Sequence, residues 1–89
     1  MEVRFVEIEI GKITHYYTNL GVGVIELADT LTVGDTIHVQ GATTDFTQKV
    51  ESIQIDSDSV AEARTGDAIG LAVQERVREG DTVYKLAGV

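Results

Sequence analysis

Three copies of one short pattern constrain the fold of this 89-residue chain more than any other feature of its sequence. Each copy is a Gly-Asp pair followed by a small residue and an apolar residue, and the copies occupy Val33–Ile37, Thr65–Ile69 and Glu79–Val83. Gly adopts positive φ at low steric cost, and an Asp side chain accepts hydrogen bonds from nearby backbone amides. The pattern therefore predicts three sharp reversals of the chain, each just before a strand.

The remaining sequence is typical of short strands joined by turns. Helical periodicity is nearly absent, Pro is missing, and β-branched residues are frequent. Further turns are expected at Asn19–Gly21 and Gly41–Asp45. We expect six strands, at about residues 3–17, 22–27, 36–40, 46–55, 68–73 and 82–87.

Three irregularities interrupt this pattern. In the first strand Val6, Ile8 and Ile10 share one face, and Gly11-Lys12 then breaks the alternation, which predicts a bulge. In the fourth strand the register slips near Ser52. The segment 56–59 is polar and predicts a loop, and Ser59-Val60-Ala61-Glu62 matches a capping box, which predicts one helical turn at residues 60–63.

A chain of this length predicts one domain, residues 1–89, with its core at about residues 6–87. Six short strands with tight turns favour closure, because closure removes exposed sheet edges. The predicted fold class is therefore all-β, a small closed six-stranded barrel that is mostly antiparallel.

Charge and composition exclude several classes of function. The net charge is −8 and the chain has only seven Lys and Arg residues, whereas tight sequence-independent nucleic-acid binders neutralise about 6–10 phosphates. We therefore expect no DNA binding. The chain has no Cys, which excludes disulfides and thiolate metal sites and fits a reducing cytoplasm. No apolar run is long enough for a membrane span, and no signal peptide is recognisable.

No arrangement of residues predicts catalysis. His15 and His38 lack metal-binding spacing, and the alternation places His38 on the outer face. Gly21-Val22-Gly23-Val24 lacks the rest of a phosphate loop, and the acidic residues lack the spacing of a calcium loop. The sequence therefore predicts no catalytic residue, no cofactor and no metal, and we expect a protein that is not an enzyme.

The cluster His15-Tyr16-Tyr17 is the strongest candidate for binding. Tyr combines an apolar ring with a polar tip, which suits both a protein interface and the stacking of a base. The structural alternative is that one Tyr packs in the core while the other covers an end of the barrel. Both interpretations stay open at this point.

Several segments resemble domain 2 of translational GTPases such as elongation factor Tu, over nearly the whole chain. They are Gly21–Ile25, Leu31–Val39, Lys49–Ile53, Glu62–Leu71 and Val77–Val83. The resemblance implies that family's Greek-key barrel. It also makes Glu51 a candidate contact, because the matching Glu in elongation factor Tu lies against the terminal adenosine of tRNA. The GTPase domain and the third barrel of that family have no counterpart here, so tRNA carriage is not implied.

A second resemblance is closer. The segment Gly41–Gln48, together with His15–Tyr17, is similar to the small barrel at the C-terminal end of some collagenase-like peptidase family proteins, a family also tied to RNA hydroxylation. The catalytic part of those proteins has no counterpart in this sequence.

Together these observations predict a non-catalytic interaction module of the cytoplasm. It would bind a protein partner in translation or RNA modification, with Tyr16, Tyr17 and Glu51 as candidate contacts. The first alternative is a binder of an RNA end, such as the tRNA acceptor, or of a nucleotide. The second is an accessory subunit of a collagenase-like peptidase or RNA hydroxylation protein. Self-association is a further expectation, because a small core gains stability by pairing.

Overall fold

The structure, a computed structural model, describes residues 4–88. Within these residues it contains ten strands and no helix. Val3, the expected first residue of the first strand, lies outside the described residues. The strands are β1 (Phe5–Tyr17), β2 (Val22–Leu27), β3 (Leu31–Thr32), β4 (Thr36–Gln40), β5 (Asp45–Lys49), β6 (Ile53–Ile55), β7 (Asp58–Val60), β8 (Glu62–Ala63), β9 (Ala68–Ala72) and β10 (Thr82–Gly88).

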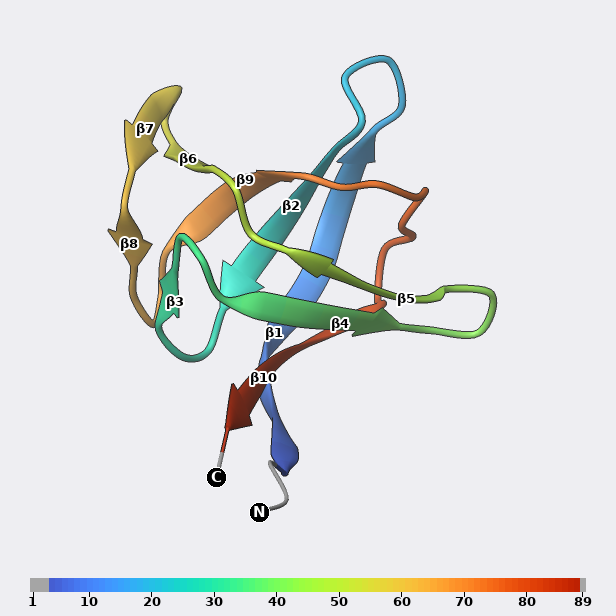
Figure 1. Cartoon of the computed structure of the whole chain (residues 1–89). Helices are drawn as coiled ribbons and strands as arrows, with labels where there is room; N and C mark the ends of the chain where they lie inside the picture. The colour runs from blue at the N-terminus through green and yellow to red at the C-terminus, as the bar shows by residue number, and fades with distance from the viewer. Residues whose placement is uncertain (1–3, 89) are drawn as a thin grey trace.

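Eight strands form one strongly bent antiparallel sheet in the order β5-β4-β10-β1-β2-β9-β6-β7, and β3 pairs separately with β8 (Figure 1). The long strand β1 joins the two halves. It pairs with β10 through its first part and with β2 through its second part. The chain is therefore all-β and antiparallel, as the sequence predicts.

The three Gly-Asp reversals are confirmed and are built alike. In each turn the Gly has a φ between 90° and 102°, and the Asp side chain accepts a hydrogen bond from the backbone amide three residues earlier. In each, the Asp amide also donates to the carbonyl of that same residue, at 3.0 Å. The three Asp residues and their partners are Asp35 with Thr32, Asp67 with Arg64, and Asp81 with Arg78.

The predicted closed barrel of six strands is not confirmed, because the sheet does not close on itself. Its end strands are β5 and β7, and these two are not paired in the described part of the chain. The expected strand at 46–55 divides at residues 50–52 into β5 and β6, where the sequence shows its register slip. Of these two strands, β6 lies beside β9 through the single pair Gln54 and Gly70.

The predicted loop at 56–59 is confirmed only at Asp56 and Ser57, and the predicted helical turn at 60–63 is wrong. Residues 58–60 form β7, and residues 62–63 form β8. Asp56 and Ser57 make the tight turn between β6 and β7, with φ values of 50° and 69°. Such a two-residue turn matches the twist of paired strands, so pairing with neighbouring strands replaces the short helix that the capping pattern favours.

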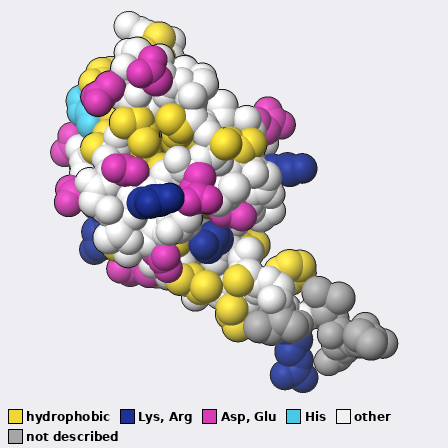
Figure 2. Space-filling model, turned by 90° about the vertical axis from the view of Figure 1, so that its left-hand side faces the viewer, with side chains coloured by type: hydrophobic (Ala, Val, Ile, Leu, Met, Phe, Trp, Pro, Cys, Tyr) yellow, Lys and Arg dark blue, Asp and Glu magenta, His cyan; other side chains and the backbone are white. Residues whose placement is uncertain are grey.

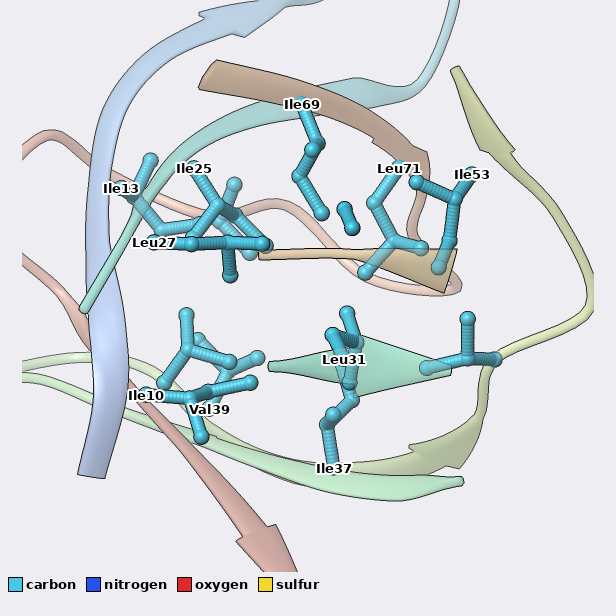
Figure 3. Packing of buried hydrophobic residues seen from close by; sticks show 14 of the residues in the cluster. Ile10, Ile13, Ile25, Leu27, Leu31, Ile37, Val39, Ile53, Ile69 and Leu71 are labelled. Atoms are coloured by element: carbon cyan, nitrogen blue, oxygen red, sulfur yellow. The ribbon is translucent and has the colours of Figure 1, made fainter. Parts of the chain in front are cut away.

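The bent sheet encloses a core of aliphatic side chains (Figure 3). Ile13, Ile25, Ile69 and Leu71 approach it from one layer, and Ile37 and Val39 approach it from the facing layer. Leu31 of β3 and Ala63 of β8 are fully buried or nearly so, and the short pair that they belong to covers one end of the core. Burial of an aliphatic side chain of this size stabilises a fold by roughly 1.5–3 kcal/mol.

The first strand departs from its predicted alternation. Ile10 is fully buried, as expected, whereas Val6 is 44% and Ile8 37% exposed. The register shifts between Glu9 and Gly11, which confirms the predicted bulge. Before this bulge, β1 has left the core and pairs with the end of β10; we call residues 5–9 of β1 with residues 84–88 of β10 the ribbon. The ribbon is three strands wide at its root, because residues 84–86 of β10 also pair with β4, and two strands wide at its tip, where Phe5 and Val6 pair with Gly88 and Ala87.

Candidate functional site

The ribbon, at one end of the molecule, has several large apolar side chains that are exposed. It projects from the body, whose extents with the ribbon are 43 × 29 × 20 Å (Figure 1). Figure 2 shows hydrophobic side chains gathered along this projecting arm. Phe5 is 66% exposed, and Val6 and Ile8 are also exposed. Two paired strands are marginally stable on their own in water, and the tip of the ribbon consists of two strands only, so its exposed apolar side chains make it a candidate interaction surface.

One edge of the ribbon has no partner strand. The other edge of β1 pairs with β2 only from Gly11 onward, and the carbonyl of Ile10 accepts a hydrogen bond from the Ala28 amide at 2.7 Å. Within residues 4–88, no strand pairs with this edge of Phe5–Glu9. Backbone N–H and C=O groups at a strand edge remain available for pairing with another strand.

A hollow of about 510 Å³ lies where the ribbon joins the body. Two carboxylates, those of Glu9 and Glu26, and the ammonium group of Lys12 line it, together with residues around Gly11 and Leu27. Neither carboxylate forms an ion pair within the described residues. The root of the ribbon is therefore hollowed and has two negative side chains against one positive side chain.

A second hollow, of about 180 Å³, lies at the seam where the sheet fails to close. The side chain of Gln48 crosses the seam. Its Nε2 donates to the carbonyl of Ala72 at 2.8 Å, and its Oε1 accepts from the amide of Gln74 at 2.8 Å. A side-chain amide thus replaces backbone pairing between β5 and the end of β9. Glu51 lines this hollow and is exposed.

A third hollow, of about 300 Å³, is lined by Tyr16, Arg76 and Arg78 among others. Val77, between the two arginines, is 1% exposed and anchors this segment in the core. Neither guanidinium is within ion-pairing distance of a carboxylate in residues 4–88. Two arginines and the ring of Tyr16 thus line one hollow, together with the carboxylate of Glu79.

His38 of β4 lies on the outer face, as predicted, and connects the ribbon with the body. Its Nδ1 contacts Glu7 of the ribbon and its Nε2 lies 2.5 Å from Asp45. The hydrogen bond to Asp45 raises the pKa of His38 above its usual value, burial opposes this, and Glu7 raises the pKa further. The two carboxylates lie at opposite ring nitrogens, and no group of three or more His, Cys, Asp or Glu side chains in the described range is placed to hold a metal ion.

The structure does not bring the three predicted contact residues together. Tyr16 is half-buried against the core and lines the arginine hollow. Tyr17 is 49% exposed, and its ring meets that of His15 edge-on at 4.4 Å. Glu51 lies in the seam hollow instead. One Tyr therefore packs against the core, as the structural alternative predicts, while the other stays exposed.

Sequence reasoning missed the arginines and the ribbon. The sequence did contain a usable signal for Arg76 and Arg78. Their i, i+2 spacing around Val77 places both side chains on one side of an extended segment. Phe5, Val6 and Ile8 gave no signal, because their alternation is that of a buried strand.

Known proteins with related sequences are much longer than this chain. An uncharacterized protease of Methanocaldococcus jannaschii is 39% identical over 84 residues, which are 93% of this chain and 21% of that protein. A Porphyromonas gingivalis collagenase is 37% identical over 81 residues, which are 89% of this chain and 20% of that protein. This chain thus spans about a fifth of the length of the curated relatives that it matches.

The fold also occurs in a solved structure. The C-terminal domain of a Geobacillus thermoleovorans protein assigned to the U32 peptidases superposes with a TM-score of 0.82 at 20% identity, over 89% of this chain and 91% of that one. A selenomethionine variant of that domain gives a TM-score of 0.81 at 18% identity, over 84% of this chain and 95% of that one. No protein-family model matches the chain.

Within residues 4–88 no helix could cross a membrane. The comparisons confirm the resemblance to collagenase-like peptidase proteins, whereas the resemblance to domain 2 of translational GTPases stays a prediction. The homologues of this chain are proteins named protease and collagenase, and its fold is that of the C-terminal domain of a U32 peptidase.

Proposed function

We propose that this chain is a non-catalytic accessory module of U32-peptidase-type proteins, which docks onto a catalytic body through its ribbon. One observation supports this proposal above the others: sequence similarity extends over 93% of this chain but only 21% of its Methanocaldococcus jannaschii relative. The remaining four fifths of such a protein is large enough to contain a separate catalytic body.

The position of the ribbon supports docking at this surface. In the Geobacillus thermoleovorans protein the corresponding domain is C-terminal, so the rest of that polypeptide joins it ahead of the first strand. In this fold the first strand begins in the ribbon, next to the exposed Phe5, Val6 and Ile8. A body attached at that point would cover the apolar side chains that this structure leaves in water.

A chimera tests the proposal. This chain replaces the matched 81 residues of the Porphyromonas gingivalis collagenase, and collagen cleavage is compared among the chimera, the parent and a variant that lacks those residues. We expect no cleavage by the 89-residue chain alone. We also expect cleavage by the chimera close to that of the parent, and a clear loss in the deletion variant. Cleavage by the isolated chain, or equal cleavage by parent and deletion variant, would contradict the proposal.

A second candidate function is the binding of an RNA end or a nucleotide, as the resemblance to translational GTPases implies. The observation that favours it is the hollow in which Tyr16 lies beside Arg76 and Arg78. A Tyr ring can stack on a base, which is worth roughly 1–3 kcal/mol, while the arginines contact phosphates. If the chain has this function, we expect its sheet to close into the complete barrel that the resemblance to translational GTPases implies.

Titration with tRNA and with short single-stranded RNA at low salt tests this second candidate. Binding should weaken at least about tenfold in the R76A/R78A variant, because each arginine contributes a phosphate contact. The control is Arg64→Ala, whose side chain is 82% exposed at a distance from this hollow. A flat titration, or equal loss in the control, would remove this candidate.

In both candidates the chain itself performs no chemical step. We place it in the cytoplasm, in keeping with its cysteine-free sequence.

A further inference from the structure

We infer that the free edge of β1 at Phe5–Glu9 is a docking site for one extended β-strand of the catalytic body, a strand with alternating apolar residues and a neutral or basic charge. This inference rests on the proposed function and goes further, because it names the backbone edge, the type of structural element and its chemistry. The geometry carries it, through the unpaired edge, the exposed apolar side chains beside it and the hollow at its end, where carboxylates outnumber ammonium groups.

The edge is built to extend the sheet. β2 pairs with β1 up to Gly11 and Leu27, and the chain then turns away at Ala28, whose amide bonds to Ile10. A strand added beside Phe5–Glu9 would continue the line of β2, and would widen the ribbon from two strands to three at its tip and from three to four at its root. Addition of a strand supplies main-chain hydrogen bonds, and a third strand stabilises a tip that is otherwise only two strands wide.

The apolar side chains favour a strand whose own side chains alternate. Val6 and Ile8 lie on one face of the ribbon, opposite Ala87 and Lys85 of β10. Lys85 is held at the root, where its Nζ donates to the carbonyl of Thr30 at 2.9 Å. Apolar residues at every second position of an added strand would lie next to Val6 and Ile8 and remove them from water.

Charge argues against a second copy of this chain as the occupant. Antiparallel pairing of two Phe5–Glu9 edges about their centre would place the two Glu7 side chains opposite each other, and like charges directly opposite destabilise a sheet. Each copy also has a net charge of −8. The hollow at the root contains Glu9 and Glu26 against the single positive charge of Lys12, and this excess of negative charge instead favours a strand that carries Lys or Arg at that end.

Hydrogen exchange in the collagenase chimera tests this inference. Exchange of individual backbone amides is measured in the chimera and in the isolated 89-residue chain. A strand docked on the edge should slow the outward-facing amides of Phe5–Glu9 by at least tenfold in the chimera. Amides in the same segment that already bond to β10 should change little, and this alternating pattern separates strand addition from general shielding.

Two pairs of matched variants sharpen the test. Ile8→Lys and Val6→Ser in the chimera should abolish the protection, because they place charge or polarity on the apolar face of the docked interface. Val33→Lys and Leu20→Ser should leave it unchanged, because Val33 is 39% and Leu20 72% exposed at other places, against 37% for Ile8 and 44% for Val6. Neither side chain of the first pair is buried, so the isolated variants should remain folded.

The two proposals fail in different ways. If the chimera cleaves collagen like the parent while the Phe5–Glu9 amides exchange as fast as in the isolated chain, the strand-docking inference is wrong and the accessory function stands. If the chimera is as inactive as the deletion variant and no amide is protected, both are wrong. Sedimentation of the isolated chain as a dimer with the same amides protected would show that a second copy occupies the edge.

Discussion

The body and the ribbon of this protein are built from the same kinds of residue and yet differ in what those residues do. In the body, apolar side chains such as Ile69 and Val83 are fully buried. In the ribbon, Val6 and Ile8 follow the same alternation and remain exposed. The comparison shows that alternation selects a face of a strand, whereas burial requires a second layer opposite that face. Where this layer is missing, the apolar side chains of a strand remain exposed to water.

The largest expected effect separates the two regions directly. Ile69→Ala should lower the free energy of unfolding by about 2–5 kcal/mol, because it removes a fully buried side chain and leaves a cavity. Phe5→Ala, at 66% exposure, should change it by less than about 0.5 kcal/mol. Urea denaturation of the isolated variants measures both values. Similar losses for the two would mean that the ribbon packs against the body and is not a free surface.

The junction between the regions should be nearly as sensitive. A Cβ at Gly11 would lie 2.3 Å from the backbone oxygen of Glu26 and 3.0 Å from Cγ2 of Ile25. Gly11→Ala should therefore cost about 1–3 kcal/mol, as overpacking usually does. The matched control is Gly88→Ala at the ribbon end, where a Cβ would have no neighbour within 4 Å and stability should not change. Thermal melting of both variants checks the pair.

The next largest effect is expected at the seam, where Gln48 connects β5 with the end of β9. Gln48→Ala removes the side-chain amide that bonds to Ala72 and Gln74, and should cost about 1–2 kcal/mol because two backbone groups lose their partner. Gln54→Ala, at an exposed position of β6, is the control and should stay within about 0.5 kcal/mol of the parent. If the two variants have equal unfolding midpoints in urea, Gln48 does not hold the seam.

The smallest effect concerns the link between ribbon and body at His38. Because its pKa is raised in the folded state, His38 contributes stability below its unfolded pKa of about 6.5 and loses that contribution as pH rises through the folded pKa. Unfolding free energies should therefore decline slightly as pH rises through this range. His38→Gln should remove this decline, and Asp45→Asn should weaken it, because Asp45 is the largest cause of the shift. A decline that persists in His38→Gln would assign it to another group.

Local chemistry explains which parts of the fold were predictable. Asp35, Asp67 and Asp81 each fix a turn through atoms three residues away, so the sequence pattern was sufficient to place all three. The bulge before Gly11 was also predictable, because the break in alternation at Gly11-Lys12 is a local feature of the sequence. Local reasoning wrongly predicted a helical turn at 60–63, because strand pairing with β3 and β6 decides the conformation there.

The candidate surfaces were less predictable. Tyr16 was predicted as a contact from its own segment, whereas the arginines that line the same hollow come from a segment some 60 residues away in the sequence. Glu51 was expected to act with the tyrosines and lies in a different hollow. Which side chains share a hollow depends on how strands cross, and no spacing within the sequence expresses that.

By itself, the sequence determined an all-β chain whose turns and alternating strands are set by neighbouring residues, since a Gly-Asp reversal forms from contacts within four residues. The tertiary structure alone decided that β1 outruns the body, that the sheet stays open at the Gln48 seam, and that Phe5, Val6 and Ile8 meet water. Burial and closure depend on how far each strand extends past its neighbours, and that is a property of the whole sheet.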